Sequence, residues 1–204
     1  MIKKYGKKLM RAVINLPKYV YSQSKVVIFQ SAPYGGGVVN PHVQIDLLEV
    51  TSHNRRFEKP FLSPEIESLV RKRIAWKSRI NDVCYLVLEQ NQIVGYGWVR
   101  SSGKTRLEEI GLSLDLDSSQ VCLYDFYIDN KARNRGIYRQ FLWLLTKKYE
   151  TCFGYAEASN AASCSGILAA GFLPLLAVSV VRVLGWKFPT TIKVLRNSGT
   201  ISNL

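Results

Sequence analysis

The chain has 204 residues, 47% of them hydrophobic and 21% charged, which fits one globular domain with an appendage and excludes a disordered protein. Eleven of its 13 net positive charges come from the two ends, because all 15 acidic residues lie between Asp46 and Glu157; this excludes a uniformly basic nucleic-acid-binding protein. Four cysteines without a C-x-x-C pair and only two histidines exclude a disulfide framework and a zinc site, so we expect no metal and a reducing, cytoplasmic compartment.

The first segment, MIKKYGKKLMRAVINL, predicts a basic amphipathic helix. Lysines and Arg11 occupy much of it, and apolar side chains recur at near-helical spacing at Ile2, Tyr5, Leu9, Val13 and Leu16. A helix of this kind either lies on an anionic membrane surface, here through residues 1–22, or packs against its own domain. The only other long apolar run, at 172–181, is too short to cross a bilayer, so we expect no transmembrane segment.

The glycine-rich stretch SAPYGGGVVNP at 31–41 predicts a linker. We therefore divide the chain into a basic N-terminal segment with its linker, residues 1–40, and a main domain, residues 41–204. The main domain opens with a predicted strand, HVQIDLLEVTS. A helix is predicted next, because Ser63 is suited to cap it, Pro64 to its first position, and Glu65 and Glu67 to its first turn.

Residues 83–102, VCYLVLEQNQIVGYGWVRSS, predict a β-hairpin in which Gly95 and Gly97 indicate a bulge or a close backbone approach. A polar loop that includes EEIGLSLDLDSS is expected to follow. Then come a strand at 119–129, a helix at 136–150, a strand at 152–159, a short helix at 160–171 and two final strands at 172–186 and 190–196. This order predicts an α/β fold with a mixed, mostly antiparallel central sheet flanked by helices.

Residues 130–141, NKARNRGIYRQF, join a predicted strand to a predicted helix. The free N–H groups of a helix's first turn, together with the helix dipole, bind anions. Gly136 has no Cβ to keep the backbone away from a phosphate, and Arg133 and Arg135 add positive charge. The pattern by itself fits either an anion cradle or a solvated turn with ordinary surface charge.

The stretch IDNKARNRGIY resembles motif A, [Q/R]-x-x-G-x-[G/A], of the GNAT superfamily of acyl-CoA-dependent N-acyltransferases. Residues 133–138 fit this motif, except that Tyr138 replaces the final small residue. The segment IVGYGW resembles a hairpin strand of a branch that pairs it with an R-G-x-G-[I/L]-Y version, which accounts for Tyr138. A second family pattern, N-x-x-[A/S] followed by a helix and G-F, is matched by Asn160, Ser163, Gly171 and Phe172.

The resemblance covers about residues 43–196 and implies a GNAT fold with acetyl-CoA, or another acyl-CoA, as cosubstrate. It implies that backbone amides from about Arg135 to Arg139 hold the CoA pyrophosphate and that the end of the strand 119–129 pairs with the pantetheine arm. The residues that it assigns to the cofactor are Phe126, Ile128, Arg133, Asn134, Arg135, Gly136, Ile137, Tyr138, Arg139, Asn160 and Ser163.

The general base that the family uses is often a carboxylate acting through water. Asp125 is our first candidate, followed by Tyr124, Tyr127 and Glu157. Strand alternation turns Asp125 away from the substrate unless a bulge reverses the phase. The tyrosine that often protonates the departing thiolate is missing, because Ile167 and Leu168 stand where it is expected; this acid is therefore relocated, or water supplies the proton.

The expected function is direct transfer of an acetyl or related acyl group to a small-molecule primary amine. The branch resemblance and the N-terminal helix favour an amino-sugar or another precursor of a bacterial surface glycan, by fold-level analogy, with a peptide or polyamine as open alternatives. The location expected is cytoplasmic, with peripheral contact at the inner face of the membrane. A rival hypothesis is a non-catalytic GNAT-like module that its basic ends recruit to membrane or, less favoured, to nucleic acid.

Overall fold

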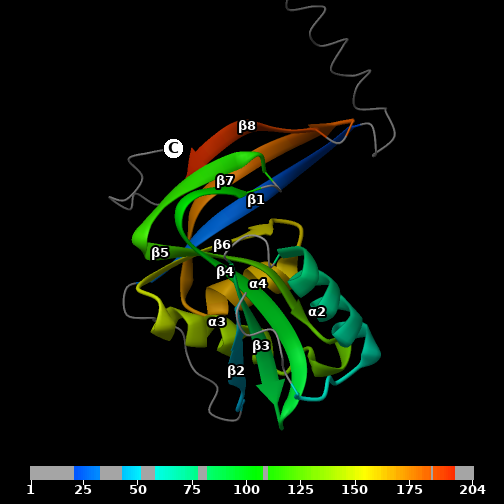
Figure 1. Cartoon of the computed structure of the whole chain (residues 1–204). Coiled ribbons are helices and arrows are strands. Elements are labelled where there is room, and N and C mark those ends of the chain that lie inside the picture. Colours follow the sequence, from blue (N-terminus) through cyan, green and yellow to red (C-terminus); the bar gives the residue numbers. More distant parts are fainter. Residues whose placement is uncertain are drawn as a thin grey trace, which may run out of the picture.

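The computed structural model describes residues 21–32, 43–51, 58–77, 82–107, 110–184 and 186–195. The predicted basic helix in MIKKYGKKLMRAVINL and most of the predicted linker lie outside these residues. In the described part of the chain, eight strands form a single sheet in the order β2-β3-β4-β5-β6-β1-β7-β8 (Figure 1). Neighbouring strands are antiparallel except for β5 and β6, which run parallel. The predicted α/β fold with a mostly antiparallel sheet is confirmed.

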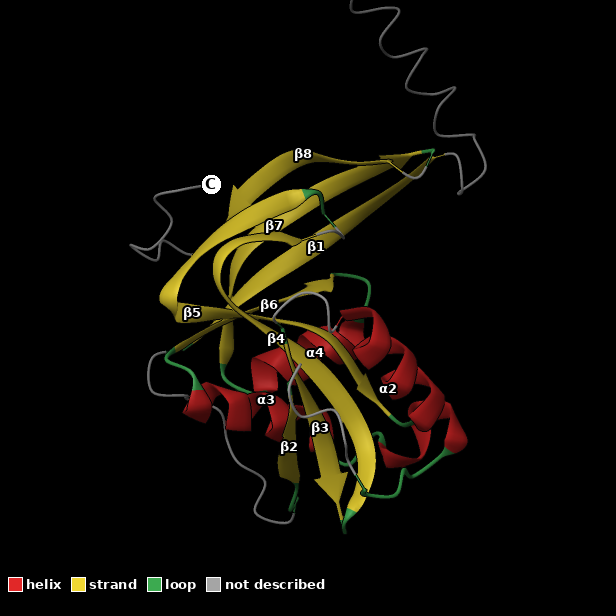
Figure 2. Cartoon of the chain, viewed as in Figure 1, coloured by secondary structure: helices red, strands yellow, loops and turns green. Residues whose placement is uncertain are grey.

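The strands and helices have the following bounds. The strands are β1 (Tyr21–Ser31), β2 (Asp46–Val50), β3 (Val83–Glu89), β4 (Gln92–Leu107), β5 (Leu112–Ile128), β6 (Thr151–Glu157), β7 (Phe172–Val183) and β8 (Trp186–Val194). The helices are α2 (Pro64–Lys77), α3 (Ile137–Lys148) and α4 (Ala161–Ala169), with a short 3-10 turn, η1 (Asn130–Ala132). Figure 2 shows that the helices gather around one half of the sheet and that the other half extends beyond them.

Strand β1 is the main departure from the prediction, which assigns no strand before residue 40. It pairs with β6 on one side, from Val26 opposite Glu157 to Gln30 opposite Phe153, and with β7 on the other. Val26, Ile28 and Phe29 are buried there. The run VVIF supplies β-branched and aromatic side chains for both faces of a central strand. The sheet therefore includes residues that precede the predicted domain boundary.

The predicted polar loop after the hairpin is mostly strand. β4 runs on to Leu107 and β5 begins at Leu112, so only a short turn separates them. Leu107, Ile110 and Leu116 are buried in one cluster with Val26 and Val178. Leucines alternate with polar residues in LSLDLD, residues 112–117, so this part of β5 has one apolar face, and that face packs on β1 and β7.

The start of helix α2 agrees with its predicted signature. The Ser63 hydroxyl accepts a hydrogen bond from the Ile66 N–H at 3.3 Å, and Glu65 and Glu67 lie in the first turn. The same hydroxyl donates to the buried carboxylate of Asp129, at the end of β5. A hydrogen bond therefore links the N-cap of α2 to the end of β5, and it fixes α2 against the strand that carries the predicted site residues.

Candidate active site

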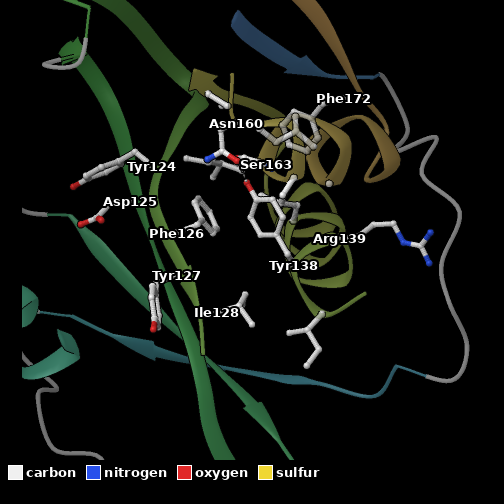
Figure 3. A pocket seen from close by; sticks show the side chains of 18 of the residues that line it. Tyr124, Asp125, Phe126, Tyr127, Ile128, Tyr138, Arg139, Asn160, Ser163 and Phe172 are labelled. Carbon is white, nitrogen blue, oxygen red and sulfur yellow. Dashed lines mark hydrogen bonds between the residues drawn. The ribbon is translucent and has the colours of Figure 1, made fainter. Parts of the chain in front are cut away.

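The two parallel strands at the centre of the sheet separate part way along their length. Pairing between β5 and β6 ends at Leu123 and Gly154. Beyond this point β5 continues beside β4 as far as Ile128, and β6 continues beside β1 as far as Glu157. The separation opens a cavity of about 620 Å³ that is lined by β5, β6, α3, α4 and the loop before α3 (Figure 3).

Almost all of the predicted site residues line this one cavity. They are Tyr124, Asp125, Phe126, Tyr127, Ile128, Arg133, Asn134, Gly136, Ile137, Tyr138, Arg139, Glu157, Asn160 and Ser163. Arg135 is missing from the described lining, because its guanidinium pairs with the Glu89 carboxylate at the end of β3. Its side chain therefore adds no charge inside the cavity. Val26 and Gly166 line the cavity without having been predicted.

The loop before α3 has the geometry of an anion cradle. Asn134 and Gly136 both have positive φ, 61° and 81°, and Gly136 is the N-cap of α3 without a side-chain cap. The first helical hydrogen bond joins the Gln140 N–H to the Gly136 carbonyl, so residues 137–139 carry the first-turn N–H groups that a helix leaves without intrahelical partners. These residues line the cavity, which places the positive end of the helix at its wall.

Arg133 braces this loop from its other side. Its Nε donates to the Ile128 carbonyl at 2.9 Å, and its guanidinium carbon lies 5.3 Å from the centre of the Tyr127 ring. Asp129 accepts from the Lys131 N–H at 2.9 Å and closes the turn η1. The side chains of Asp129 and Arg133, on either side of η1, therefore attach the cradle to the end of β5.

Tyr138, which departs from motif A, packs against a glycine of α4. A Cβ on Gly166 would lie only 2.5 Å from the Tyr138 ring, so the missing side chain there makes room for the tyrosine. The Tyr138 ring also makes an edge contact with Phe126, and its hydroxyl lies 3.4 Å from the Ser163 Oγ. Burial raises the pKa of Tyr138, so the phenol keeps its proton at neutral pH.

Asn160 lies at the N-terminus of α4. Its side-chain oxygen accepts the Ser163 N–H at 3.0 Å, so it caps the helix as well as lining the cavity. The second predicted motif thus places both of its polar residues in one capped turn, opposite Tyr138.

A bulge in β5 decides which way the candidate catalytic residues point. Tyr127 lies opposite Tyr96 and Tyr124 opposite Trp98, so two residues of β5 face the single residue Gly97 of β4. Asp125 carries the bulge, with φ of 52°. A Cβ on Gly97 would lie 2.4 Å from the Phe126 ring, so the glycine is what lets the bulged strand come close.

The bulge reverses the alternation of side chains, as the sequence analysis allowed. Phe126 and Ile128 pack in the cluster next to α3, whereas Tyr124 and Tyr127 pack in the cluster next to α2. Figure 3 shows Asp125 pointing to the same side of β5 as Tyr124 and Tyr127, away from Tyr138. The Asp125 carboxylate lies 3.4 Å from Nε of Arg73 on α2, and its charge adds to the effect of burial in raising the pKa of Tyr96.

Tyr124 belongs to a buried polar cluster. Its hydroxyl donates to the Asp82 carboxylate, which also accepts from Nε and Nη2 of Arg100 at 2.9 and 2.6 Å. Burial first, and then the Asp82 carboxylate, raise the pKa of Tyr124 well above its usual range. The phenol therefore stays protonated at neutral pH, with its hydroxyl bound to Asp82. Sequence reasoning missed Asp82 and Arg100, which carry no local motif.

Replacing Asp82 with alanine is expected to destabilise the protein by about 3 kcal/mol, because it leaves the largely buried Arg100 guanidinium without its carboxylate. Chemical denaturation measures this change in the free energy of unfolding. The matched control is Asp46→Ala, at an exposed edge position, which should change stability by less than about 0.5 kcal/mol. Equal effects of the two substitutions would contradict the role of the Asp82 cluster.

The two remaining candidates lie on different sides of the cavity. Tyr127 donates to Glu65 of α2 at 3.3 Å and stacks on Tyr96, with ring centres 6.0 Å apart. Glu157, at the end of β6, accepts from Nη2 of Arg182 at 2.9 Å. Each of these side chains already has a protein partner.

The described residues contain no group of three or more histidine, cysteine or acidic side chains that could hold a metal ion. No helix among them is long and apolar enough to span a bilayer.

Solved structures share this fold at low sequence identity. A conserved protein of unknown function from Staphylococcus epidermidis ATCC 12228 superposes with a TM-score of 0.54 and 10% identity over 86% of this chain and 66% of its own. A GNAT-family acetyltransferase from Colwellia psychrerythraea has a TM-score of 0.50 and 14% identity over 84% of this chain and 57% of its own. This chain thus spans about two thirds or less of either protein. No protein-family model and no curated protein matches the sequence.

Proposed function

We propose that this chain, which has the fold of the GNAT superfamily, is an acyl-CoA-dependent N-acyltransferase that moves an acetyl or related acyl group to a primary amine. One observation carries the proposal: the uncapped N-terminus of α3 and the diverging ends of β5 and β6 line the same cavity. The cosubstrate would supply an activated thioester. The chain's part is to bind its phosphates and arm, and to move protons at the amine.

The residues present suit the two halves of such a cosubstrate. The first-turn N–H groups of residues 137–139 provide the donors and partial positive charge that a pyrophosphate needs, with Arg139 at the cavity wall. Among the described residues, no strand pairs with β5 on its β6 side beyond Leu123, and an amide-containing arm would lie along this edge. Phe126 lies in the bulge, outside the register with β4, and lines the cavity, where its N–H is our candidate for polarising the thioester carbonyl.

Asp125 is the candidate that we favour as the general base. It lines the cavity, lies on the side of β5 that faces α2, and carries a carboxylate that Arg73 holds at 3.4 Å. Glu65 lies near the same side through its contact with Tyr127. Carboxylates here would attract a cationic amine and remove its proton, directly or through water.

The substitution Asp125→Asn is expected to lower kcat about a hundredfold with little change in the affinity for acetyl-CoA, because the amide cannot accept the amine proton. Steady-state rates of thiol release measure kcat. Glu157→Gln, across the cavity, is the matched control and should retain activity. A larger loss in Glu157→Gln than in Asp125→Asn would transfer the role to Glu157.

For the acceptor we propose an amino-sugar or another precursor of a surface glycan. This choice rests on fold-level analogy together with the polar side chains at the α2 side of the cavity. Polyamines and peptide amines are the alternatives to be compared with it.

Calorimetry with acetyl-CoA tests the proposal first. We expect a Kd on the order of micromolar, and much weaker binding of acetyl-pantetheine, which lacks the pyrophosphate that the cradle would hold. Thiol release is then measured with amino-sugars, a polyamine and a lysine peptide. Absence of binding to the folded protein would refute the acyltransferase. Binding without turnover on all three classes would instead favour the non-catalytic module.

A further inference from the structure

The half of the sheet that extends beyond the helices has a face on which the described residues leave apolar side chains exposed. Among the described residues, six of the seven large hydrophobic side chains that are exposed lie between Leu184 and Leu195. Trp186 pairs with Val183, and Phe188 pairs with Val181. Directly paired residues of antiparallel strands project to the same side, so these four side chains share one face of the sheet. We call them, together with Leu184 at the turn, the hairpin patch.

The charges around the hairpin patch are positive. Lys25 of β1 pairs with Ser179, and Lys193 of β8 pairs with Ala177. Ser179 and Ala177 lie on the same face of β7 as Val181, so both lysines share the face of the hairpin patch, and both are exposed. Ion-paired Glu157 belongs to the opposite face, because it pairs with Val26. No acidic residue occurs in the sequence before Asp46 or after Glu157. The patch therefore combines exposed aromatic side chains with cations and has no acid on its own strands.

The N-terminal part of the chain joins the sheet at this patch. Tyr21, the first residue of β1, pairs with Val183 next to the turn between β7 and β8. Figure 1 shows the start of β1 beside that turn. The 20 residues that precede Tyr21 contain lysines and Arg11 but no acid. Basic sequence is therefore attached where the aromatic side chains are exposed.

We propose that the hairpin patch binds the surface of an anionic lipid membrane. Trp and Phe side chains insert at the boundary between headgroups and acyl chains, and nearby lysines are attracted to anionic headgroups. Trp186 and Leu184, exposed by 73% and 71%, would enter first, because they lie at the end of the hairpin. The proposal does not depend on the acyltransferase function. Combined with that function, it would bring the cavity close to acceptors that are carried on lipid.

The test is sedimentation of the full chain with vesicles, at low and high salt. We expect binding to vesicles with phosphatidylglycerol, weak binding to pure phosphatidylcholine, and a steep loss with salt. The double variant Trp186→Ser/Phe188→Ser should bind at least roughly tenfold more weakly. So should Lys25→Glu/Lys193→Glu, by removing the headgroup attraction.

The matched control uses the other face of the same strand. Ile192 and Val194 are exposed by 46% and 49%, close to the 50% of Phe188, but pair with Val178 and Leu176 and so point away from the hairpin patch. Ile192→Ser/Val194→Ser should bind vesicles like the unmodified chain. Equal binding by all variants would overturn the proposal and assign any membrane contact to other residues. A dimer that dissociates in Trp186→Ser/Phe188→Ser would also overturn it, because a second copy then covers the patch.

Calorimetry separates this proposal from the acyltransferase proposal. Acetyl-CoA affinity should be unchanged in the hairpin-patch variants, since their side chains do not line the cavity. Vesicle binding without CoA binding would support the membrane proposal and refute the acyltransferase. CoA binding without vesicle binding would support the acyltransferase and refute the membrane proposal.

Discussion

A Gly136→Trp variant should fold and yet bind acetyl-CoA at least about a hundredfold more weakly than the unmodified chain, which corresponds to about 3 kcal/mol. Gly136 lines the cavity at the N-cap of α3, directly before the N–H groups that would hold the pyrophosphate. An indole at this position occupies the space in front of those donors. Calorimetry measures the loss of affinity, and thermal unfolding shows whether the variant is folded.

The matched control for this experiment is Gly103→Trp. Gly103 has φ of 78°, against 81° for Gly136, so both substitutions force a left-handed backbone onto a bulky residue at a cost of about 1–2 kcal/mol. A Cβ on Gly103 would meet nothing within 4 Å, and the residue does not line the cavity. Gly103→Trp should therefore keep its CoA affinity. An equal loss in both variants would attribute the effect to stability, and unchanged binding in Gly136→Trp would place the cosubstrate elsewhere.

A chain that begins at Val43, close to the predicted domain boundary, is expected not to fold. It lacks β1, which pairs with both β6 and β7. Its absence leaves two facing strand edges unpaired and removes the buried side chains of Val26, Ile28 and Phe29. Burial of each is worth about 1.5–3 kcal/mol, and the sum is comparable with the whole stability of a domain, about 5–15 kcal/mol.

Circular dichroism and denaturant titration measure this result. A chain that begins at Tyr21 keeps all of β1 and is the matched control, expected to show strand content and a cooperative transition. If the shorter chain also unfolded cooperatively, β1 would be an addition to a domain that is stable without it. The same comparison tests the cavity, because Val26 lines it from β1.

The arrangement around β5 assigns different tasks to neighbouring residues. Tyr124 is engaged with Asp82 and Arg100, whereas Asp125, one residue later, stands in the bulge and contacts Arg73 on α2. Phe126 then turns to the opposite side, toward Tyr138. The one extra residue in the bulge thus places Tyr124 and Asp125 on the α2 side of β5 and Phe126 on the α3 side. A strand without the bulge would place Asp125 on the side of α3.

Features whose causes lie within a few residues can be predicted from the sequence. The cap of α2 at Ser63, the glycines beside the bulge and the positive-φ turn before α3 are local requirements of backbone geometry, so their residue types indicate them. The two motifs have the same property. They placed most of the cavity lining in advance, because each motif occupies one strand end and one helix start.

Features that depend on partners far apart in the chain become visible only in the folded protein. β1 reaches its place between β6 and β7 only through pairing with strands more than a hundred residues later. Arg135 forms an ion pair with Glu89, and Tyr124 donates a hydrogen bond to Asp82. The absence of a side chain at Gly166 makes room for the Tyr138 ring. No local pattern encodes such pairs, since a charge, a phenol or a missing Cβ acquires its partner only when the strands and helices pack together.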